Sequence, residues 1–206
     1  MRNDIGNVNV PWDEVYNFEP RPYRWTVEAF YQACEAGLFD EARVQLLDGE
    51  IIEMPAMKNQ HALGIDFTQK ALEAAFGPNC WVRVQMSLDL KPWSVPDPDL
   101  LVVPGSSRSW VGKDNPTGGL LLVEVSETTL WTDRNRKAPI YATAGIQDYW
   151  ILNLVDRQLE VYRDPVADPT ARLGHRYQTR TDLVAGDTVT PLALPGTSIA
   201  VIDLLP

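Results

Sequence analysis

Residues 120–126 read Leu120-Leu121-Leu122-Val123-Glu124-Val125-Ser126 and form the most apolar run in the chain. A short, continuous apolar run predicts a central strand with both faces buried. Glu124 places a carboxylate inside that run. A carboxylate is costly to bury unless it is paired, hydrogen-bonded or bound to a cation. Glu124 is therefore either a residue at a strand end that faces water or part of a functional site.

A second apolar run, residues 98–103, reads Pro98-Asp99-Leu100-Leu101-Val102-Val103 and also predicts a strand. Asp99 stands at its start. If the two strands are neighbours, the carboxylates of Asp99 and Glu124 can converge on one point. Hard divalent cations such as Mg²⁺ are held by one or two carboxylates together with water and phosphate oxygens. Such a site could activate water and offset the charge on a phosphodiester.

Lys137 adds a cation on the helix that is predicted to follow the strand of Glu124. Asp133, Lys137 and Tyr141 are spaced by four residues, so they share one helix face. A lysine there could reach the attacking water or the scissile phosphate. The alternative is an ordinary surface ion pair between Asp133 and Lys137, worth roughly a few tenths of a kcal/mol. The spacing alone leaves both interpretations open.

The rest of the chain alternates predicted helices, strands and hairpins. Apolar spacing predicts helices over residues 26–36 and 59–76, and Asp48-Gly49 between two apolar runs predicts a hairpin. The predicted strands are residues 81–88, 149–154 and 159–163, and the predicted helix after Glu124 covers residues 133–144. Helices between strands in the middle, flanked by hairpins, predict an α/β fold with a mixed β-sheet core flanked by helices and additional β-hairpins. With 206 residues, we expect one domain over 25–206, preceded by an N-terminal arm over 1–24.

The composition restricts the partners and the compartment. The net charge is −10, from 28 acidic and 18 basic residues. This balance argues against a protein that binds polyanions in bulk, although a local basic face or bound divalent cations can reverse the field at one site. No stretch approaches the ~18 consecutive apolar residues of a membrane span, and the N-terminus lacks the apolar run of a signal peptide. The two cysteines have no CxxC spacing, so we expect a protein of the reducing cytoplasm without a membrane partner.

The order of these motifs resembles the PD-(D/E)xK signature of restriction-endonuclease-like proteins and, more narrowly, the Uma-type family of endonucleases. The similarity runs from about Trp25 to the C-terminus. The stretches that carry it are residues 46–54, His61, residues 98–103, residues 122–126, Asp133, Lys137, Tyr141, Gly145, residues 148–151, the strand at Tyr162-Arg163 and the turn at residues 194–196. Each motif is short, and their order and spacing together give the resemblance its specificity.

The resemblance implies a restriction-endonuclease-like fold, a site for Mg²⁺ or Mn²⁺, DNA as the substrate and a homodimer or higher homo-oligomer. It implies that Asp99 and Glu124 are metal ligands and that Lys137 is the catalytic lysine. Glu50 could complete the metal shell, and His61 could bind a phosphate or relay a proton, since imidazole titrates near neutrality. Both also have plain structural interpretations. Glu50 could be a solvated hairpin residue, and His61 could bond to the backbone where a helix begins.

Two positions depart from the family pattern. Ser126 stands where the wider superfamily has the x-K lysine, and Lys137 on the following helix matches the lysine that replaces it in this family. Gln45 stands where family members usually carry a glutamate, so it adds no negative charge. The basic residues predicted to lie nearest the site are Arg83, Arg108, Lys113, Arg134 and Arg136. They are candidates for phosphate contact and equally candidates for ordinary surface charge.

Three functions are compatible with the sequence. The leading hypothesis is a divalent-metal-dependent endonuclease that hydrolyses DNA phosphodiester bonds. The alternative is a catalytically inactive nuclease-fold protein that serves as a dimeric binding module, which the net charge of −10, Ser126 and Gln45 favour. A third hypothesis is a hydrolase of another class in which Asp99 and Glu124 act as a general acid and base, as in glycoside hydrolysis.

Overall fold

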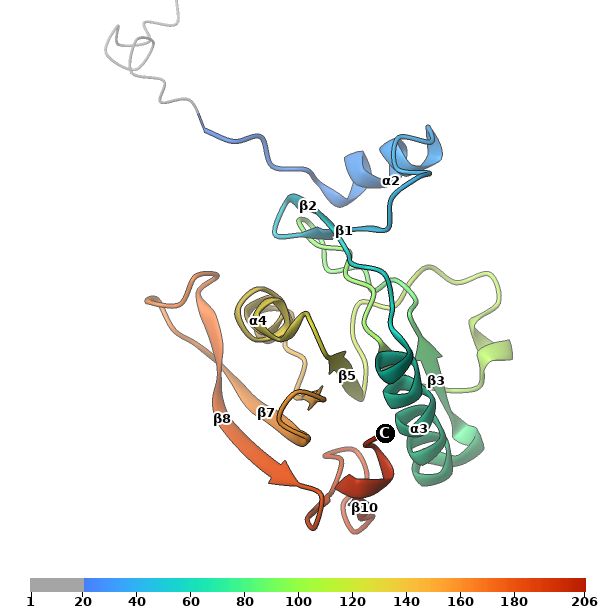
Figure 1. Cartoon of the computed structure of the whole chain (residues 1–206). Helices are drawn as coiled ribbons and strands as arrows, with labels where there is room; N and C mark the ends of the chain where they lie inside the picture. The colour runs from blue at the N-terminus through green and yellow to red at the C-terminus, as the bar shows by residue number, and fades with distance from the viewer. Residues whose placement is uncertain (1–20) are drawn as a thin grey trace, which may run out of the picture.

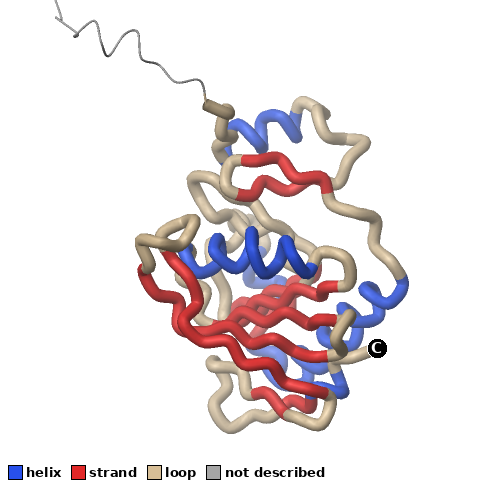
Figure 2. Tube along the Cα trace, turned by 60° about the vertical axis from the view of Figure 1, so that its left-hand side comes forward, coloured by secondary structure: helices blue, strands red, loops and turns tan. Residues whose placement is uncertain are grey.

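The computed structural model describes residues 21–206, and residues 1–20 of the predicted N-terminal arm lie outside the described part. Its centre is a six-stranded sheet with the strand order β3-β4-β5-β6-β7-β8. The strands are β3 (Cys80–Val84), β4 (Leu100–Pro104), β5 (Leu121–Ser126), β6 (Asp148–Asn153), β7 (Gln158–Ala167) and β8 (His175–Val184). Only β5 and β6 pair in parallel, and the other neighbours pair antiparallel. The prediction of a mixed sheet is confirmed, and Figure 2 shows these strands side by side.

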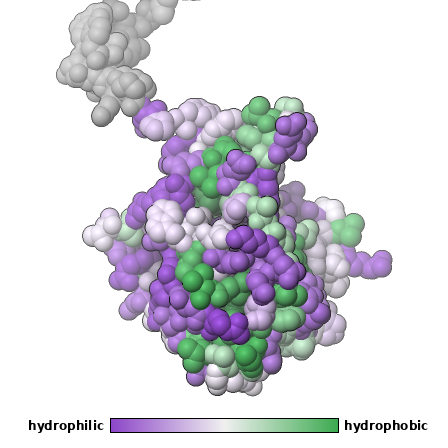
Figure 3. Space-filling view, in the orientation of Figure 1, coloured by the Kyte–Doolittle hydropathy of each residue, from purple (hydrophilic) through white to green (hydrophobic). Residues whose placement is uncertain are grey.

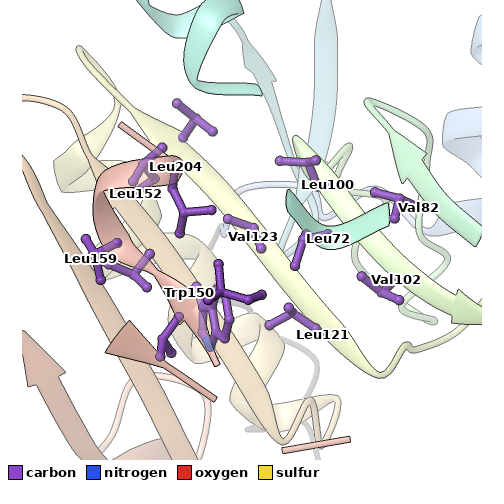
Figure 4. Packing of buried hydrophobic residues seen from close by; sticks show 14 of the residues in the cluster. Leu72, Val82, Leu100, Val102, Leu121, Val123, Trp150, Leu152, Leu159 and Leu204 are labelled. Carbon is purple, nitrogen blue, oxygen red and sulfur yellow. The ribbon is translucent and has the colours of Figure 1, made fainter. Parts of the chain in front are cut away.

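Helices cover both faces of this sheet (Figures 1 and 2). The helix α3 (Asn59–Phe76) packs on one face, where the core includes Leu72, Val123 and Trp150 (Figure 4). The other face carries one continuous helical segment built from α4 (Leu130–Thr132), a π-helical turn (Asp133–Lys137) and α5 (Ala138–Thr143). Side chains alternate along a strand, so Val123 and Val125 of β5 face α3. Leu122 and Glu124 therefore face the helical segment that follows β5.

A glycine allows α3 to lie directly against β5. A Cβ atom at Gly64 would lie 2.9 Å from Cγ1 of Val125, which is closer than two carbon atoms can pack. Glycine normally weakens a helix interior by roughly 0.5–1 kcal/mol relative to alanine. At Gly64 this cost is offset by the close approach, which sets the distance between α3 and the strand that carries Glu124.

The N-terminal part of the described chain forms a smaller unit beside the sheet (Figure 1). Thr26 caps α2 (Val27–Glu35) by accepting a hydrogen bond from the N–H of Ala29 at 3.2 Å. The hairpin of β1 (Val44–Leu47) and β2 (Glu50–Glu53) turns at Asp48 and Gly49, whose φ angles are 53° and 79°. Two consecutive positive φ angles are typical of the tight hairpin turn that Asp-Gly predicts. The hairpin and α2 share a small core of Val27, Phe30, Leu46 and Val95.

The C-terminal part completes the core on the α3 side. The short strands β9 (Thr188–Val189) and β10 (Ile199–Ala200) pair antiparallel, and the last residues pack with α3. Hydrophobic and hydrophilic residues are interspersed over the face of the molecule shown in Figure 3. None of the helices within residues 21–206 is long and apolar enough to cross a membrane.

The predicted elements differ from the observed ones mainly at their ends. The helices predicted over residues 26–36 and 59–76 are confirmed as α2 and α3. The strand predicted over residues 81–88 ends at Val84, because Gln85 takes a positive φ of 49° and leaves the sheet. The helical segment after β5 begins at Leu130, earlier than predicted, and contains a π-helical turn that ends at Lys137, two residues before Pro139. Proline cannot donate to the helical ladder, and a wider turn accommodates it.

Candidate active site

The two acidic residues predicted from separate strands meet at one end of the sheet. Leu100 of β4 pairs with Val123 of β5, so Asp99 lies level with Glu124. The N–H of Val125 donates to Oδ2 of Asp99 at 2.9 Å, which fixes that carboxylate against the strand. Asp99 is 5% exposed and Glu124 is 2% exposed, and both line one pocket. Strand register therefore produces the convergence that the sequence predicted.

Lys137 reaches this pair from the helix that follows β5. Its Nζ lies 2.9 Å from Oε1 of Glu124 and 3.4 Å from Oδ1 of Asp133, and Lys137 is itself only 2% exposed. Tyr141, four residues further along, donates its hydroxyl to the same Oε1 of Glu124 at 2.7 Å. Lys137 and Tyr141 both hold Oε1. No hydrogen bond from another residue in 21–206 engages Oε2, so this oxygen is available to a ligand in the pocket.

Ser126 has a defined task at the position where the superfamily has its x-K lysine. Its hydroxyl donates to Oδ2 of Asp133 at 2.6 Å, and the hydroxyl of Thr129 donates to the same oxygen at 2.8 Å. Tyr149 donates its hydroxyl to the backbone oxygen of Asp133 at 3.1 Å. These contacts anchor the π-helical turn that begins at Asp133 and ends at Lys137. Such turns are rare, and they occur frequently at functional sites.

Two side chains hold the other oxygen of Asp99. Nε2 of His61, in the first turn of α3, lies 3.1 Å from Oδ1 of Asp99. Nε2 of Gln85 donates to the same oxygen, also at 3.1 Å. Gln85 follows β3 with its positive φ, so the residue that ends that strand also supports the site. His61 thus contacts a candidate metal ligand and lines the pocket itself.

Burial and charge shift the protonation equilibria of the cluster in opposite directions. Burial raises the pKa of Glu124 to about 8, and Asp133 and Asp99 add to the rise although Lys137 and Tyr141 oppose it. Burial alone would lower the pKa of Lys137, but the carboxylates of Glu124 and Asp133 hold it above its ordinary value. Burial would raise the pKa of Asp99, but His61 and Lys137 bring it below its ordinary value. The cluster therefore combines an ionised Asp99, an ammonium at Lys137 and a Glu124 that takes up a proton readily.

The lining of the pocket includes one fully buried side-chain polar atom that has no hydrogen-bond partner within residues 21–206. Gln45 is 1% exposed, and its Nε2 donates weakly to the backbone oxygen of Asp97 at 3.5 Å, whereas its Oε1 is buried without a hydrogen bond. A buried acceptor without a donor is costly, unless a cation or a donor from a ligand completes it. Burial also raises the pKa of Asp97, which lines the same pocket.

The donors in this pocket fit a hard divalent cation. Carboxylate and amide oxygens are the ligands that Mg²⁺ and Mn²⁺ prefer, and Asp99, Glu124 and Oε1 of Gln45 supply three such groups. Within residues 21–206 there is no group of three or more His, Cys, Asp or Glu side chains arranged to hold a metal. Mg²⁺ characteristically keeps several waters and needs only one or two protein carboxylates, so the donor set is sufficient for that ion.

The structure brings Asp99, Glu124, Lys137 and His61 together, but it does not bring Glu50 to them. The Glu50 side chain is 52% exposed and pairs with Nη1 of Arg136 at 2.6 Å on the surface. Glu50 does not line the pocket that contains the cluster. It begins β2 beside the hairpin turn, whereas Gln45 and Met54, near the open end of the hairpin, line the pocket.

The predicted placement of the basic residues was wrong. None of the five predicted side chains lines the pocket, and the basic residues that line it besides Lys137 and His61 are Arg43 and Lys58. Arg134 pairs instead with buried Glu160, and Arg136 pairs with Glu50. The sequence analysis also missed Gln85 and Asp97, because neither lies in a motif. Asp97 lies close to Asp99 in sequence, which could have indicated a role, whereas the separation of 14 residues between Gln85 and Asp99 gives no such signal.

Comparison with known families agrees with this geometry. Residues 27–202 match the Uma2 family, described as "Putative restriction endonuclease". The chain belongs to the Uma2 family. The resemblance noted from the sequence motifs is thereby confirmed, and the matched residues include the whole cluster around Glu124. A search of curated proteins found no match to the chain.

A solved structure shares the fold of this Uma2 chain. It is a crystal structure from Anabaena variabilis of a protein described as a "putative nuclease belonging to DUF820", with a TM-score of 0.59 and 14% sequence identity. The match covers 80% of this chain and 90% of that chain. At this identity the similarity shows the fold alone, and it confirms the predicted nuclease-like α/β architecture.

Proposed function

We propose that this Uma2 protein is a divalent-metal-dependent endonuclease that hydrolyses phosphodiester bonds in DNA. The observation that carries the proposal is the arrangement of Asp99, Glu124 and Lys137 around one pocket, with both carboxylates almost fully buried. Stability alone does not explain two buried carboxylates beside a buried lysine, since a buried ion pair often stabilises a protein no more than apolar residues in its place. A role in binding a cation and a phosphate accounts for their burial.

Each residue of the cluster has a separate task in this proposal. Asp99 and Glu124 would hold the cation, and the chemistry that a divalent cation would supply there is positive charge beside the phosphate and activation of water. Lys137 donates hydrogen bonds to the attacking oxygen or to the phosphate. Tyr141 keeps Oε1 of Glu124 in place, and His61 keeps Asp99 oriented.

The proposal includes the ion, the assembly and the compartment. Restriction-endonuclease-like proteins generally use divalent metals, and we propose Mg²⁺ or Mn²⁺ as the ion here. We also propose a homodimer, which light scattering of the purified chain would test. We propose the reducing cytoplasm as the compartment, and the free thiols of Cys34 and Cys80 support that proposal.

A nicking assay on supercoiled plasmid tests the proposal. Wild-type protein should convert the plasmid to the nicked form in Mg²⁺ or Mn²⁺ and should stop when EDTA is added. Asp99→Asn should abolish nicking, because the amide carries no charge for the cation. Metal binding by the wild type without nicking of any DNA would instead favour the inactive binding module.

A further inference from the structure

Two basic side chains at the rim of the proposed site, Arg43 and Lys58, form no ion pair within residues 21–206. Most Lys and Arg side chains within residues 21–206 pair with a carboxylate, as in Arg134 with Glu160 and Arg163 with Asp148. Arg43 and Lys58 form no ion pair or side-chain hydrogen bond with a residue of the described range, and both line the pocket that contains Asp99 and Glu124. Among the Lys and Arg side chains that line this pocket, the third, Lys137, is paired with Glu124 and Asp133.

The two cations approach the pocket from different elements. Arg43 precedes β1, and its backbone oxygen accepts from the N–H of Met54 at 2.8 Å, so the open end of the hairpin fixes its position. Lys58 directly precedes α3, and both of these side chains are exposed.

The beginning of α3 adds to the positive potential beside Lys58. The first helical hydrogen bond runs from the N–H of Ala62 to the oxygen of Lys58, so the N–H groups of residues 59–61 precede it. No side chain caps this 18-residue helix at its N-terminus. Uncapped N–H groups at a helix start attract anions. Glu127 also lines the pocket, so Arg43, Lys58 and the start of α3 are the groups there that an anion would contact.

We propose that Arg43 and Lys58 bind the substrate's backbone phosphates next to the bond held at Asp99 and Glu124. This inference rests on the proposed function, and it assigns the phosphate contacts that the sequence analysis placed on other residues. The ligand class is a nucleic-acid strand, because two separated cations on one rim suit successive phosphates. The contacts act on the backbone, so they add affinity without reading the base sequence.

Salt-dependent binding of a short DNA duplex tests the inference directly. Fluorescence anisotropy would follow binding in Ca²⁺, for the wild type and for the double variant Arg43→Gln/Lys58→Gln. The matched control is Arg108→Gln/Arg157→Gln, which removes the same charge from two exposed positions outside this pocket. Circular dichroism melting would confirm that all three proteins fold alike, which is expected because every substituted side chain is exposed.

The slope of log affinity against log salt separates the outcomes. The slope should become shallower by about one for each phosphate contact removed, so by about two in Arg43→Gln/Lys58→Gln, and it should stay unchanged in the control. An unchanged slope in the double variant, an equal change in the control, or no duplex binding by the wild type would overturn the inference. If the wild type does not nick plasmid but the salt slope is still shallower in Arg43→Gln/Lys58→Gln, the phosphate contacts are supported and only the nuclease proposal fails.

Discussion

Nζ of Lys137 lies 2.9 Å from Oε1 of Glu124 although the two residues belong to different elements, and each is 2% exposed. The lysine also lies 3.4 Å from Oδ1 of Asp133, so one ammonium serves two buried carboxylates. Ionisation of both carboxyl groups would leave a negative charge in excess inside the protein, and the raised pKa of Glu124, about 8, avoids that excess at neutral pH without metal. A divalent cation in the pocket would displace the Glu124 proton, which links the stability of the cluster to its proposed chemistry.

Replacing Lys137 by methionine should abolish nicking and destabilise the fold. Removing one partner of a buried pair leaves uncompensated charge, and the free energy of unfolding should fall by about 3–5 kcal/mol. Urea denaturation at neutral pH measures this change. The control is Lys70→Met, which removes an exposed pair with Asp66 and should cost at most about 0.5 kcal/mol. Equal effects of the two substitutions would show that the Lys137 pair is not buried as described.

Replacing Gln45 by glutamate should strengthen metal binding. The substitution places a third carboxylate where Oε1 of Gln45 now lacks a hydrogen-bond partner within residues 21–206. Affinity for hard cations rises with the number of ligand charges, so Mn²⁺ should bind on the order of tenfold more tightly. Without metal, the extra charge should lower the melting temperature. Calorimetric titration checks the affinity, with Gln147→Glu as an exposed control, and equal affinities would exclude Gln45 from the metal shell.

Metal affinity should depend on pH through Glu124. The folded, metal-free protein holds the Glu124 proton until about pH 8, and the cation requires the ionised carboxylate. Mn²⁺ affinity should therefore rise with pH by up to roughly tenfold per unit below that value, and it should level off above it. Titrations at a series of pH values test this, and an affinity that falls as the pH rises from 6 to 8 would contradict it.

The same proton affects stability without metal. The folded-state pKa of about 8 lies above the ordinary value of 4.5, so the folded protein binds more protons than the unfolded chain between these values. The stabilising contribution of this group is thus full below about pH 4.5 and is lost as the pH rises toward 8. Denaturation of wild type and Glu124→Gln across this range should show the wild type losing more stability than the variant, and parallel curves would disagree with the assigned pKa.

Gly64→Ala should destabilise the protein, contrary to the usual effect in a helix. Alanine ordinarily stabilises a helix interior by roughly 0.5–1 kcal/mol relative to glycine. At Gly64 the new Cβ would lie 2.9 Å from Cγ1 of Val125, and overpacking of this kind costs about 1–3 kcal/mol. Thermal melting shows whether the substitution lowers the melting temperature, as expected, or raises it. A higher melting temperature would show that α3 does not press on β5 as closely as described.

The sequence predicted those parts of the site that depend on local pattern. Glu124 and Asp99 stand out because each is a charge in an apolar run, and antiparallel register then brings them together. Lys137 follows from helical spacing, although the π-helical turn that contains it does not, because that turn depends on the contacts of Asp133 with Ser126 and Thr129.

Other site features could not be predicted, because they arise from tertiary packing. Arg43 and Lys58 are far in sequence from Asp99 and Glu124, and only the tertiary packing of the hairpin and α3 places them at the pocket. Glu50 illustrates the reverse case. Its position after the hairpin turn suggested a metal ligand, but the hairpin directs it toward Arg136 on the surface.

Calorimetric titration of Mn²⁺ into wild type, Glu124→Gln and Glu50→Gln is the most direct test of the central claim. Glu124→Gln keeps the size of the side chain and removes its charge, and Glu50→Gln makes the same change at the exposed position outside the pocket. We expect the wild type and Glu50→Gln to bind with equal affinity and Glu124→Gln to lose binding. Unchanged binding by Glu124→Gln would contradict the assignment of this pocket as the metal centre.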